Sequence, residues 1–245
     1  MPDDLLTRLD DLRRATGDSS ADGRVRRETS PDGTECRIVF TRCAPAQLDE
    51  LISAEKARAD TLGYALEWKT YGHDVPTELP GRLLAAGFRA DDAESVLTVP
   101  LTRIAAFGGG TPHDIRRVHD LADYAEVSRQ IGRTNVEEEA QQLAAVMRDT
   151  PDRLSVYVAY VDGEPASCGR VYFHPGSPFA ELAGGRTIPT RRRLGLFTAL
   201  VAARLHEARD RGCTHAIVDA LPTSEPILTK RGFERLTTTT PYLYG

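Results

Sequence analysis

The sequence contains few lysines and no long apolar run. Lys56, Lys69 and Lys230 are its only lysines, against 28 arginines, and the formal net charge is −5. A protein that grips nucleic acid through its phosphates carries a clustered excess of basic residues, so this balance argues against a nucleic-acid partner. No apolar stretch approaches the length of a membrane span, which argues against a membrane partner.

The four cysteines, Cys36, Cys43, Cys168 and Cys213, are widely spaced and form no CxxC pair. Such spacing argues against a zinc site and against the disulfide framework of a small secreted protein. The N-terminal residues include acids where a signal peptide has bases. We therefore expect a cytoplasmic protein with reduced cysteines and no metal.

The length and composition fit two modules or one enlarged module. The chain has 245 residues, of which 40% are hydrophobic, enough to build real cores. In the first half, periodicity and turn residues predict a helix after Pro2, a polar loop at 17–23, strands at 36–42, 64–71 and 95–101, and helices at 46–62 and 77–86.

The second half contains clearer signals. Asp162-Gly163 between two apolar runs predicts a hairpin turn. A helix over 197–211 is predicted because Phe197, Leu200, Val201, Leu205 and Ala208 share one face. The other predicted elements are strands at 114–118, 155–161, 166–173, 179–188, 215–220 and 235–244, and helices at 122–131, 136–147 and 224–231.

The two halves share an order of elements. In the first half the order is helix, Gly63, strand, helix, Gly87-Phe88 and strand. The second half has the corresponding order helix, Gly212, strand, helix, Gly232-Phe233 and strand. This pattern predicts a tandem of two related α/β modules, although helix, glycine, strand is also common in unrelated α/β proteins. The glycines at 108–110 give the best boundary, so we expect modules at 1–107 and 108–245.

The most informative segment runs from Ile188 to Phe197, between a predicted strand and a predicted helix. A glycine-containing turn into a helix leaves unpaired backbone N–H groups at the positive end of that helix, a ready site for phosphate oxygens. Nearby arginines add charge-assisted hydrogen bonds. The alternative is a solvated arginine-rich cap. The segment lacks the Gly-Lys-Ser/Thr ending of a Walker loop and the three glycines of a dinucleotide fingerprint.

The segment Arg192-Arg193-Leu194-Gly195-Leu196-Phe197, preceded by Pro189, resembles the coenzyme motif of the GNAT superfamily of acetyl-CoA-dependent N-acetyltransferases. The later elements through Gly232-Phe233 match the family in order and spacing, and the resemblance covers about residues 112–245. Phe197 departs from the family pattern, which has Gly or Ala there. The resemblance implies an α/β (α+β) fold with a mixed, mostly antiparallel twisted sheet flanked by helices, in tandem arrangement.

The resemblance also implies chemistry. Acetyl-CoA would be the co-substrate, with no metal, and a primary amine of a small molecule or peptide would attack it directly. The coenzyme-binding residues would be Thr187, Ile188, Arg192, Arg193, Leu194, Gly195, Leu196 and Phe197, with a strand N–H near Thr187 or Ile188 polarising the thioester. A homodimer is left open by the sequence.

Glu181 is the first candidate for the general base, because its position fourteen residues before Gly195 resembles that of the catalytic Glu in one branch of the family. His174 is the alternative base. The Tyr that serves the family as general acid is replaced by Leu228. Tyr242 is therefore the candidate acid, with Tyr244 and Tyr172 as alternatives, unless solvent protonates the thiolate.

Three further expectations follow from the residues. The first half has Cys43-Ala44-Pro45-Ala46 in place of the motif and looks like a degenerate GNAT-like module that binds no coenzyme. Acids at 126 and 137–139 could attract a cationic amine, although a solvated helix face also explains them. Two other functions stay open: a catalytically silent acyl-CoA sensor or scaffold, and nucleic-acid binding through Arg186 and Arg191 to Arg193.

Overall fold

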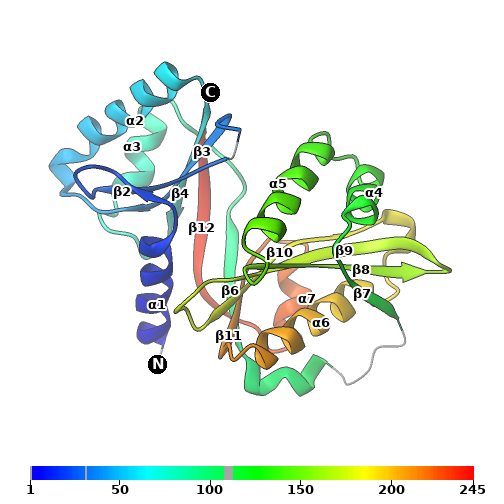
Figure 1. The fold of residues 1–245 in the computed structure, drawn as a ribbon. Helices are drawn as coiled ribbons and strands as arrows, with labels where there is room; N and C mark the ends of the chain where they lie inside the picture. Colours follow the sequence, from blue (N-terminus) through cyan, green and yellow to red (C-terminus); the bar gives the residue numbers. More distant parts are fainter. Residues whose placement is uncertain (1, 31, 108–112) are drawn as a thin grey trace. The chain divides into compact units, whose positions relative to one another are not determined.

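The computed structural model describes residues 2–30, 32–107 and 113–245. The chain divides into two compact units (Figure 1). Unit 1 consists of Met1–Val96, Ala220–Pro222 and Arg235–Gly245, and unit 2 of Leu97–Asp219 and Thr223–Glu234. The glycines at 108–110, where we expect the module boundary, lie outside the described residues.

Unit 1 is a sheet with helices packed on it, and its strands follow the order β1-β2-β3-β4-β12, with β5 paired to β12. All these pairings are antiparallel except that of β3 with β4. Its elements are α1 (Pro2–Ala15), β1 (Asp18–Ser19), β2 (Val25–Thr29), β3 (Glu35–Thr41), the 3-10 helix η1 (Pro45–Gln47), α2 (Leu48–Leu62), β4 (Ala65–Tyr71), α3 (Leu79–Ala85), β5 (Arg89–Ala90) and β12 (Glu234–Tyr244).

The last strand of the chain completes the core of unit 1. In β12, Tyr242 lies opposite Trp68 and Tyr244 opposite Leu66 of β4. Trp68 and Tyr242 are both buried in the hydrophobic cluster that α2 and α3 cover. Alternation along β12 turns every second side chain toward this cluster, so the C-terminal strand contributes to unit 1 although it follows unit 2 in sequence.

The strands of unit 2 follow the order β7-β8-β9-β10-β11. The pairings are antiparallel except that of β10 with β11. Figure 1 shows α4 and α5 on one face of this sheet and α6 on the other. Its elements are η2 (Leu101–Phe107), β7 (Asp114–Val118), α4 (Ala122–Gln130), α5 (Val136–Asp149), β8 (Leu154–Val161), β9 (Glu164–Phe173), β10 (Phe179–Thr187), η3 (Pro189–Arg191), α6 (Leu196–Asp210), β11 (His215–Ala220) and α7 (Glu225–Thr229), while β6 (Glu94–Pro100) contains the division between the units.

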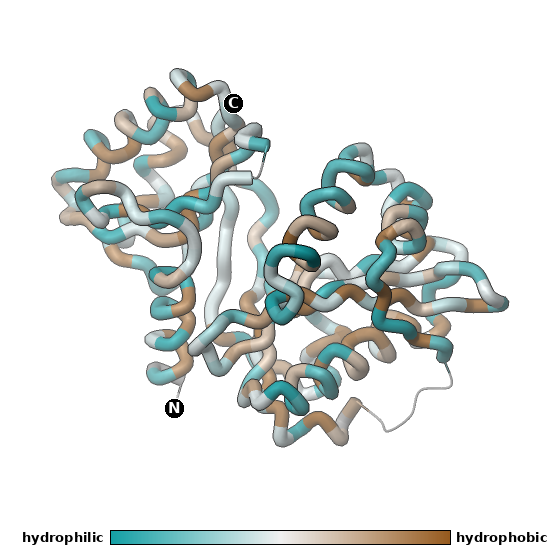
Figure 2. The backbone as a smooth tube through the Cα atoms, in the orientation of Figure 1, coloured by the Kyte–Doolittle hydropathy of each residue, from teal (hydrophilic) through white to brown (hydrophobic). Residues whose placement is uncertain are grey.

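These elements confirm most of the sequence predictions. Asp162 and Gly163 both adopt positive φ (55° and 82°), as the predicted two-residue hairpin turn requires. In unit 2 the helices alternate between hydrophobic and hydrophilic residues, as expected for helices that bury one face (Figure 2). The sequence does not predict strands β1, β2 and β5 or the 3-10 helices η2 and η3. In the described part of the chain, no helix is long and apolar enough to cross a membrane.

Candidate functional site

Strands β10 and β11 of unit 2 run parallel but stay paired for only a short distance. The register joins Phe179 to His215, Ala180 to Ala216 and Glu181 to Ile217. Beyond these pairs β10 continues to Thr187 and β11 to Ala220 without pairing to each other. Beyond Glu181 the two strands therefore do not pair with each other, and the loop before α6 follows the unpaired part of β10.

A β-bulge lies in this unpaired part of β10. The register against β9 shifts by one residue between Ala183 and Arg186. Gly184 adopts a left-handed conformation (φ 59°), and a Cβ on it would lie 2.5 Å from the Arg170 guanidinium. A side chain there would be strained, because the backbone conformation favours glycine and the Arg170 guanidinium would have to move.

An ion cluster secures the bulge on the α4/α5 face of the sheet. Glu139 of α5 accepts hydrogen bonds from Arg186 at 2.7 Å and from Arg170 at 2.9 Å. Tyr124 and Ser128 of α4 accept further bonds from these two arginines. Burial by itself raises the pKa of the Glu139 carboxyl, but the bonds and charges of Arg186 and Arg170 hold that pKa below its usual value.

A buried arginine secures the bulge from the α6 face. Arg204 is only 2% exposed and donates to the carbonyl oxygens of Leu200 (3.0 Å), Arg170 (3.0 Å) and Ala183 (3.3 Å). A Cβ on Gly169 would lie 2.8 Å from its Nη1, so the guanidinium occupies the space that this glycine leaves. Arg170 and Ala183 are the cross-strand pair that directly precedes the bulge.

The loop that leads into α6 has two residues with left-handed backbone. Arg193 (φ 66°) carries a side chain in a conformation that costs about 1–3 kcal/mol and is retained mainly at functional sites. Gly195 (φ 84°) is the N-cap of α6 and offers no side chain to the first-turn N–H groups. A Cβ at this position would lie 3.3 Å from His113. These N–H groups thus remain available to an anion, with Arg192 and Arg193 beside them.

Phe197, which departs from the family pattern, is accommodated by a second glycine. Its Cε2 lies 2.9 Å from where a Cβ on Gly185 would stand. The ring therefore packs over the bulge of β10, between the strand and the first turn of α6. The missing side chain at Gly185 compensates for the bulky residue at 197.

The two predicted thioester-binding N–H groups differ in the structure. Ile188 donates its N–H to the carbonyl of Ala166 at 3.0 Å. Thr187 lies opposite Ser167, one position along the same register. Because N–H groups of an antiparallel strand point alternately toward and away from the partner, the Thr187 N–H points away from β9. The Ile188 N–H is therefore already bonded within the sheet, whereas the Thr187 N–H points to the other side of β10.

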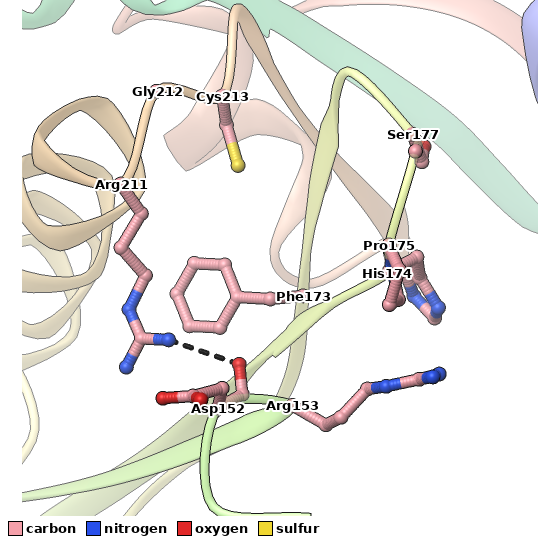
Figure 3. Close-up of a pocket in the computed structure, with 10 residues that line it drawn as sticks. Asp152, Arg153, Phe173, His174, Pro175, Ser177, Arg211, Gly212 and Cys213 are labelled. Carbon is pink, nitrogen blue, oxygen red and sulfur yellow. Dashed lines mark hydrogen bonds between the residues drawn. The ribbon is translucent and has the colours of Figure 1, made fainter.

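Glu181 is the last residue of β10 that pairs with β11, and on the other side it lies opposite Tyr172 of β9. Its Oε2 lies 2.9 Å from Nε2 of His174, and the two side chains are 38% and 25% exposed. His174 also lines an open cavity of about 450 Å³. In Figure 3 the Phe173 ring of this cavity points toward Arg211, which donates to the Asp152 carbonyl.

The three tyrosines considered as general acid lie in different units. Tyr242 is 7% exposed in the core of unit 1, and burial raises its pKa. Tyr244, also in unit 1, donates to Asp60. The role of Tyr242 as general acid stays a prediction. Tyr172 lies in unit 2 beside Glu181, where burial raises the pKa of its hydroxyl despite the nearby Arg170. Leu228 is buried in α7.

Several charged residues singled out in the sequence have partners. Glu126 and Glu137 both accept bonds from Arg129, and Glu139 accepts bonds from Arg170 and Arg186. This pairing neutralises most of the acids that were expected to attract a cationic amine. Arg186, a candidate for binding nucleic acid, is committed to Glu139.

Sequence reasoning missed Arg204 and Gly169. A signal for Arg204 was present, because it lies four residues after Leu200 and three after Val201, on the apolar face of the predicted helix. A charged residue on that face indicates a buried polar contact. Gly169 gave no comparable signal, since the contact that requires it comes from a helix more than thirty residues later.

Comparisons with known proteins agree with this architecture. Residues 118–233 match the model of the acetyltransferase (GNAT) family. No curated protein matches the sequence. Among solved structures, a conserved protein of unknown function from Staphylococcus epidermidis is similar with a TM-score of 0.69 and 15% identity, over 93% of each chain.

Two further solved structures share the fold of both halves. A tandem GNAT protein from the clavulanic acid biosynthesis pathway has a TM-score of 0.64 and 17% identity, over 86% of this chain and 75% of its own. A GCN5-related N-acetyltransferase from Kribbella flavida has a TM-score of 0.65 and 16% identity, over 97% of this chain and 93% of its own. The predicted fold class and tandem arrangement are confirmed, and residues 118–233 form a domain of the acetyltransferase (GNAT) family.

Proposed function

We propose that the protein is an N-acetyltransferase that transfers an acetyl group from acetyl-CoA to a primary amine of a small molecule or peptide. The observation that carries the proposal is the parting of β10 from β11 next to the arginine and glycine loop of α6. Together they would accommodate the thioester arm and the pyrophosphate within one unit.

The pyrophosphate would lie at the N-terminus of α6. The N–H groups from Arg193 to Phe197 would donate to its oxygens, and the side chains of Arg192 and Arg193 would add charge. The pantetheine arm, which carries amide groups, would pair with the open edge of β10 as an added strand does. The N–H of Thr187 would donate to the thioester oxygen, where negative charge develops during attack.

Glu181 would act as the general base. The amine nitrogen attacks the thioester carbon, the C–S bond breaks, and the nitrogen gives up a proton that the Glu181 carboxylate accepts. His174, bonded to Glu181, would receive this proton and pass it to solvent in the cavity that it lines. Acetylation of an ammonium group releases one proton per turnover, so the base must be emptied before the next cycle.

Tyr172 would protonate the departing thiolate and take its own proton back from solvent. Its raised pKa keeps the hydroxyl protonated at neutral pH, as an acid requires. Tyr172 lies on β9, opposite Glu181. It would replace the family's usual tyrosine, because the residue at that position is Leu228, which has no hydroxyl. The ammonium group would lose one proton to solvent before attack, so that with the proton relayed from Glu181 the net release is one proton per turnover.

The proposal is tested by measuring CoA release with a panel of amines, together with thermal stabilisation by acetyl-CoA. A ligand at a hundred times its Kd adds about 2.7 kcal/mol to stability. Glu181→Gln should lower kcat about a hundredfold, with acetyl-CoA affinity unchanged. Glu164→Gln, which alters an exposed acid of the same unit, is the matched control.

Two results would contradict the proposal. The absence of stabilisation at millimolar acetyl-CoA would remove the coenzyme site. Binding without turnover of any amine, unaffected by Glu181→Gln, would instead favour a silent acyl-CoA sensor. His174→Ala separates the proposed relay from the base, because added imidazole should enter the open cavity and restore part of the lost rate.

A further inference from the structure

Arg204 is a buried cation that the proposed chemistry does not use. It is 2% exposed, and its three recorded hydrogen bonds all go to backbone carbonyls. Within the described residues no carboxylate lies within ion-pair distance of it. Glu207, one turn further along α6, is bonded to Ser155, Tyr157 and Arg211.

An unpaired buried charge is costly, because desolvation disfavours the charged form. Burial accordingly lowers the pKa of the Arg204 guanidinium to about 10. At position 204, on the apolar face of α6, a leucine or methionine would pack without this penalty. The arginine therefore calls for an explanation beyond the stability of the helix packing.

The contacts of Arg204 lead to the bulge. It donates to Arg170 and Ala183, whose cross-strand pair is the last before the register shifts. A guanidinium fills the space over a glycine on each face of the sheet: Arg204 over Gly169, and Arg170 over Gly184. The two peptide planes at the start of the bulge are thus held by donors that a regular strand would not need.

We propose that Arg204 is a positioning residue for the coenzyme: seated on Gly169, it holds the carbonyls of Arg170 and Ala183 and keeps the bulge of β10 open for the thioester arm of acetyl-CoA. The inference rests on the proposed function, because it assumes that acetyl-CoA binds along β10. Without these donors, β10 gains freedom to slide toward a regular register, which would turn the strand residues after the bulge to the opposite face.

The experiment compares three variants with one control. Arg204→Met keeps the length of the side chain and removes its donors. Arg204→Lys keeps the charge and donates through a single amine. Gly169→Ala retains the arginine and displaces its guanidinium. Arg209→Met, on the same helix, changes an exposed arginine that pairs with Asp210 and serves as the control.

The readout is the affinity for two probes, acetyl-CoA and ADP, in each variant whose unfolding transition is intact. ADP carries the pyrophosphate but lacks the pantetheine arm. We expect Arg204→Met and Gly169→Ala to weaken acetyl-CoA binding at least tenfold, equivalent to about 1.4 kcal/mol, and to leave ADP binding unchanged. Arg204→Lys should recover part of the loss.

Three outcomes overturn the inference: acetyl-CoA affinity equal to that of the wild type in Arg204→Met, equal loss of both probes, or no recovery by lysine. Equal loss would assign Arg204 a general structural role. A wild-type protein that binds neither probe would overturn the proposed function itself, which is distinguishable because it involves no variant. If Arg204→Met fails to fold, Gly169→Ala and Arg204→Lys decide between these outcomes.

Discussion

Each unit contains a bulged strand whose carbonyl is held by a buried arginine, but the two arginines have different partners. In unit 1, Val39 of β3 is the extra residue opposite Arg26 and Arg27, and Arg13 donates to its carbonyl at 3.0 Å. Arg13 also pairs with Asp10 and Asp74, each at 2.7 Å. In unit 2, Arg204 has carbonyl partners only.

The crossovers after the two bulged strands differ as well. Both begin with a proline that opens a 3-10 turn, and both continue into a helix of 15 residues. The helix starts three residues after Pro45 in unit 1 and seven residues after Pro189 in unit 2. The first turn of α2 carries Asp49 and Glu50, whereas that of α6 has no acid.

This comparison explains how one architecture can support two tasks. Unit 1 lacks the four residues that separate the 3-10 turn from the helix in unit 2, its first helical turn carries two acids, and its bulge arginine pairs with two carboxylates. Unit 2 has the added segment, a first turn without acids, and glycines around the bulge. The proposed coenzyme module thus differs from unit 1 in a few local features.

The strongest way to break the comparison is to make the same substitution at both arginines. Arg13→Met leaves Asp10 and Asp74 without their buried partner and should lower the free energy of unfolding by about 3–5 kcal/mol. Arg204→Met leaves no carboxylate without a partner and should cost less, about 1–3 kcal/mol, because only carbonyl acceptors lose a donor. Urea denaturation measures both. Equal losses would show that the two arginines play the same role.

The next largest effect concerns the glycine that faces Phe197. Gly185→Ala places a Cβ against the Phe197 ring and should weaken acetyl-CoA binding by about 2 kcal/mol, the cost of overpacking a filled site. Phe197→Ala alone should have a smaller effect, and the double variant should regain most of the affinity. Titration of the four proteins gives the coupling energy. A coupling of zero would mean that the ring does not control the bulge.

A smaller change makes the first turn of α6 resemble that of α2. Thr198→Glu places an acid where α2 has Glu50. It should reduce acetyl-CoA affinity by about 1 kcal/mol, because an anion at the helix N-terminus competes with the pyrophosphate. Thr198→Gln is the matched control, and the difference between them should shrink at high salt. A difference that does not depend on salt would argue against an electrostatic cause.

The smallest expected effect is a pH dependence in unit 2. The pKa of Glu139 is lowered in the folded state, so its contribution to stability is present above its unfolded pKa and is lost as pH falls through the folded value. Unfolding free energy should therefore decline below about pH 5. Glu139→Gln should flatten that decline in the transition of unit 2. An unchanged slope would assign the acid sensitivity to other carboxylates.

The sequence predicts the elements of both halves well because their signals are local. The turn at Asp162-Gly163 and the arginine and glycine loop before α6 need only neighbouring residues. Tyr242 could not be placed in the same way, since the partner of its strand is β4, about 170 residues earlier in the chain. That the Ile188 N–H is already bonded to Ala166 likewise follows only from the register of β10 against β9, which the sequence does not give.

The candidate site shows the same division between local and long-range information. Thr187, Glu181 and the loop residues lie in one unit, where the motif and the strand pattern predict them. The roles of Gly169, Gly184 and Gly185 follow from arginine and phenylalanine side chains that reach them from other elements. Sequence spacing gives the backbone position of a glycine but not the side chain that fills its empty space.

The position of β12 has a consequence for biosynthesis. A ribosome releases the residues of α1 through α3 long before those of the strand that pairs with β4, and unit 2 emerges between them. The hydrophobic cluster around Trp68 thus lacks the Tyr242 side chain until all of unit 2 has been translated. Unit 1 is therefore completed only after unit 2 has been translated, and until then the edge of β4 lacks its partner strand, the kind of edge that promotes misassembly.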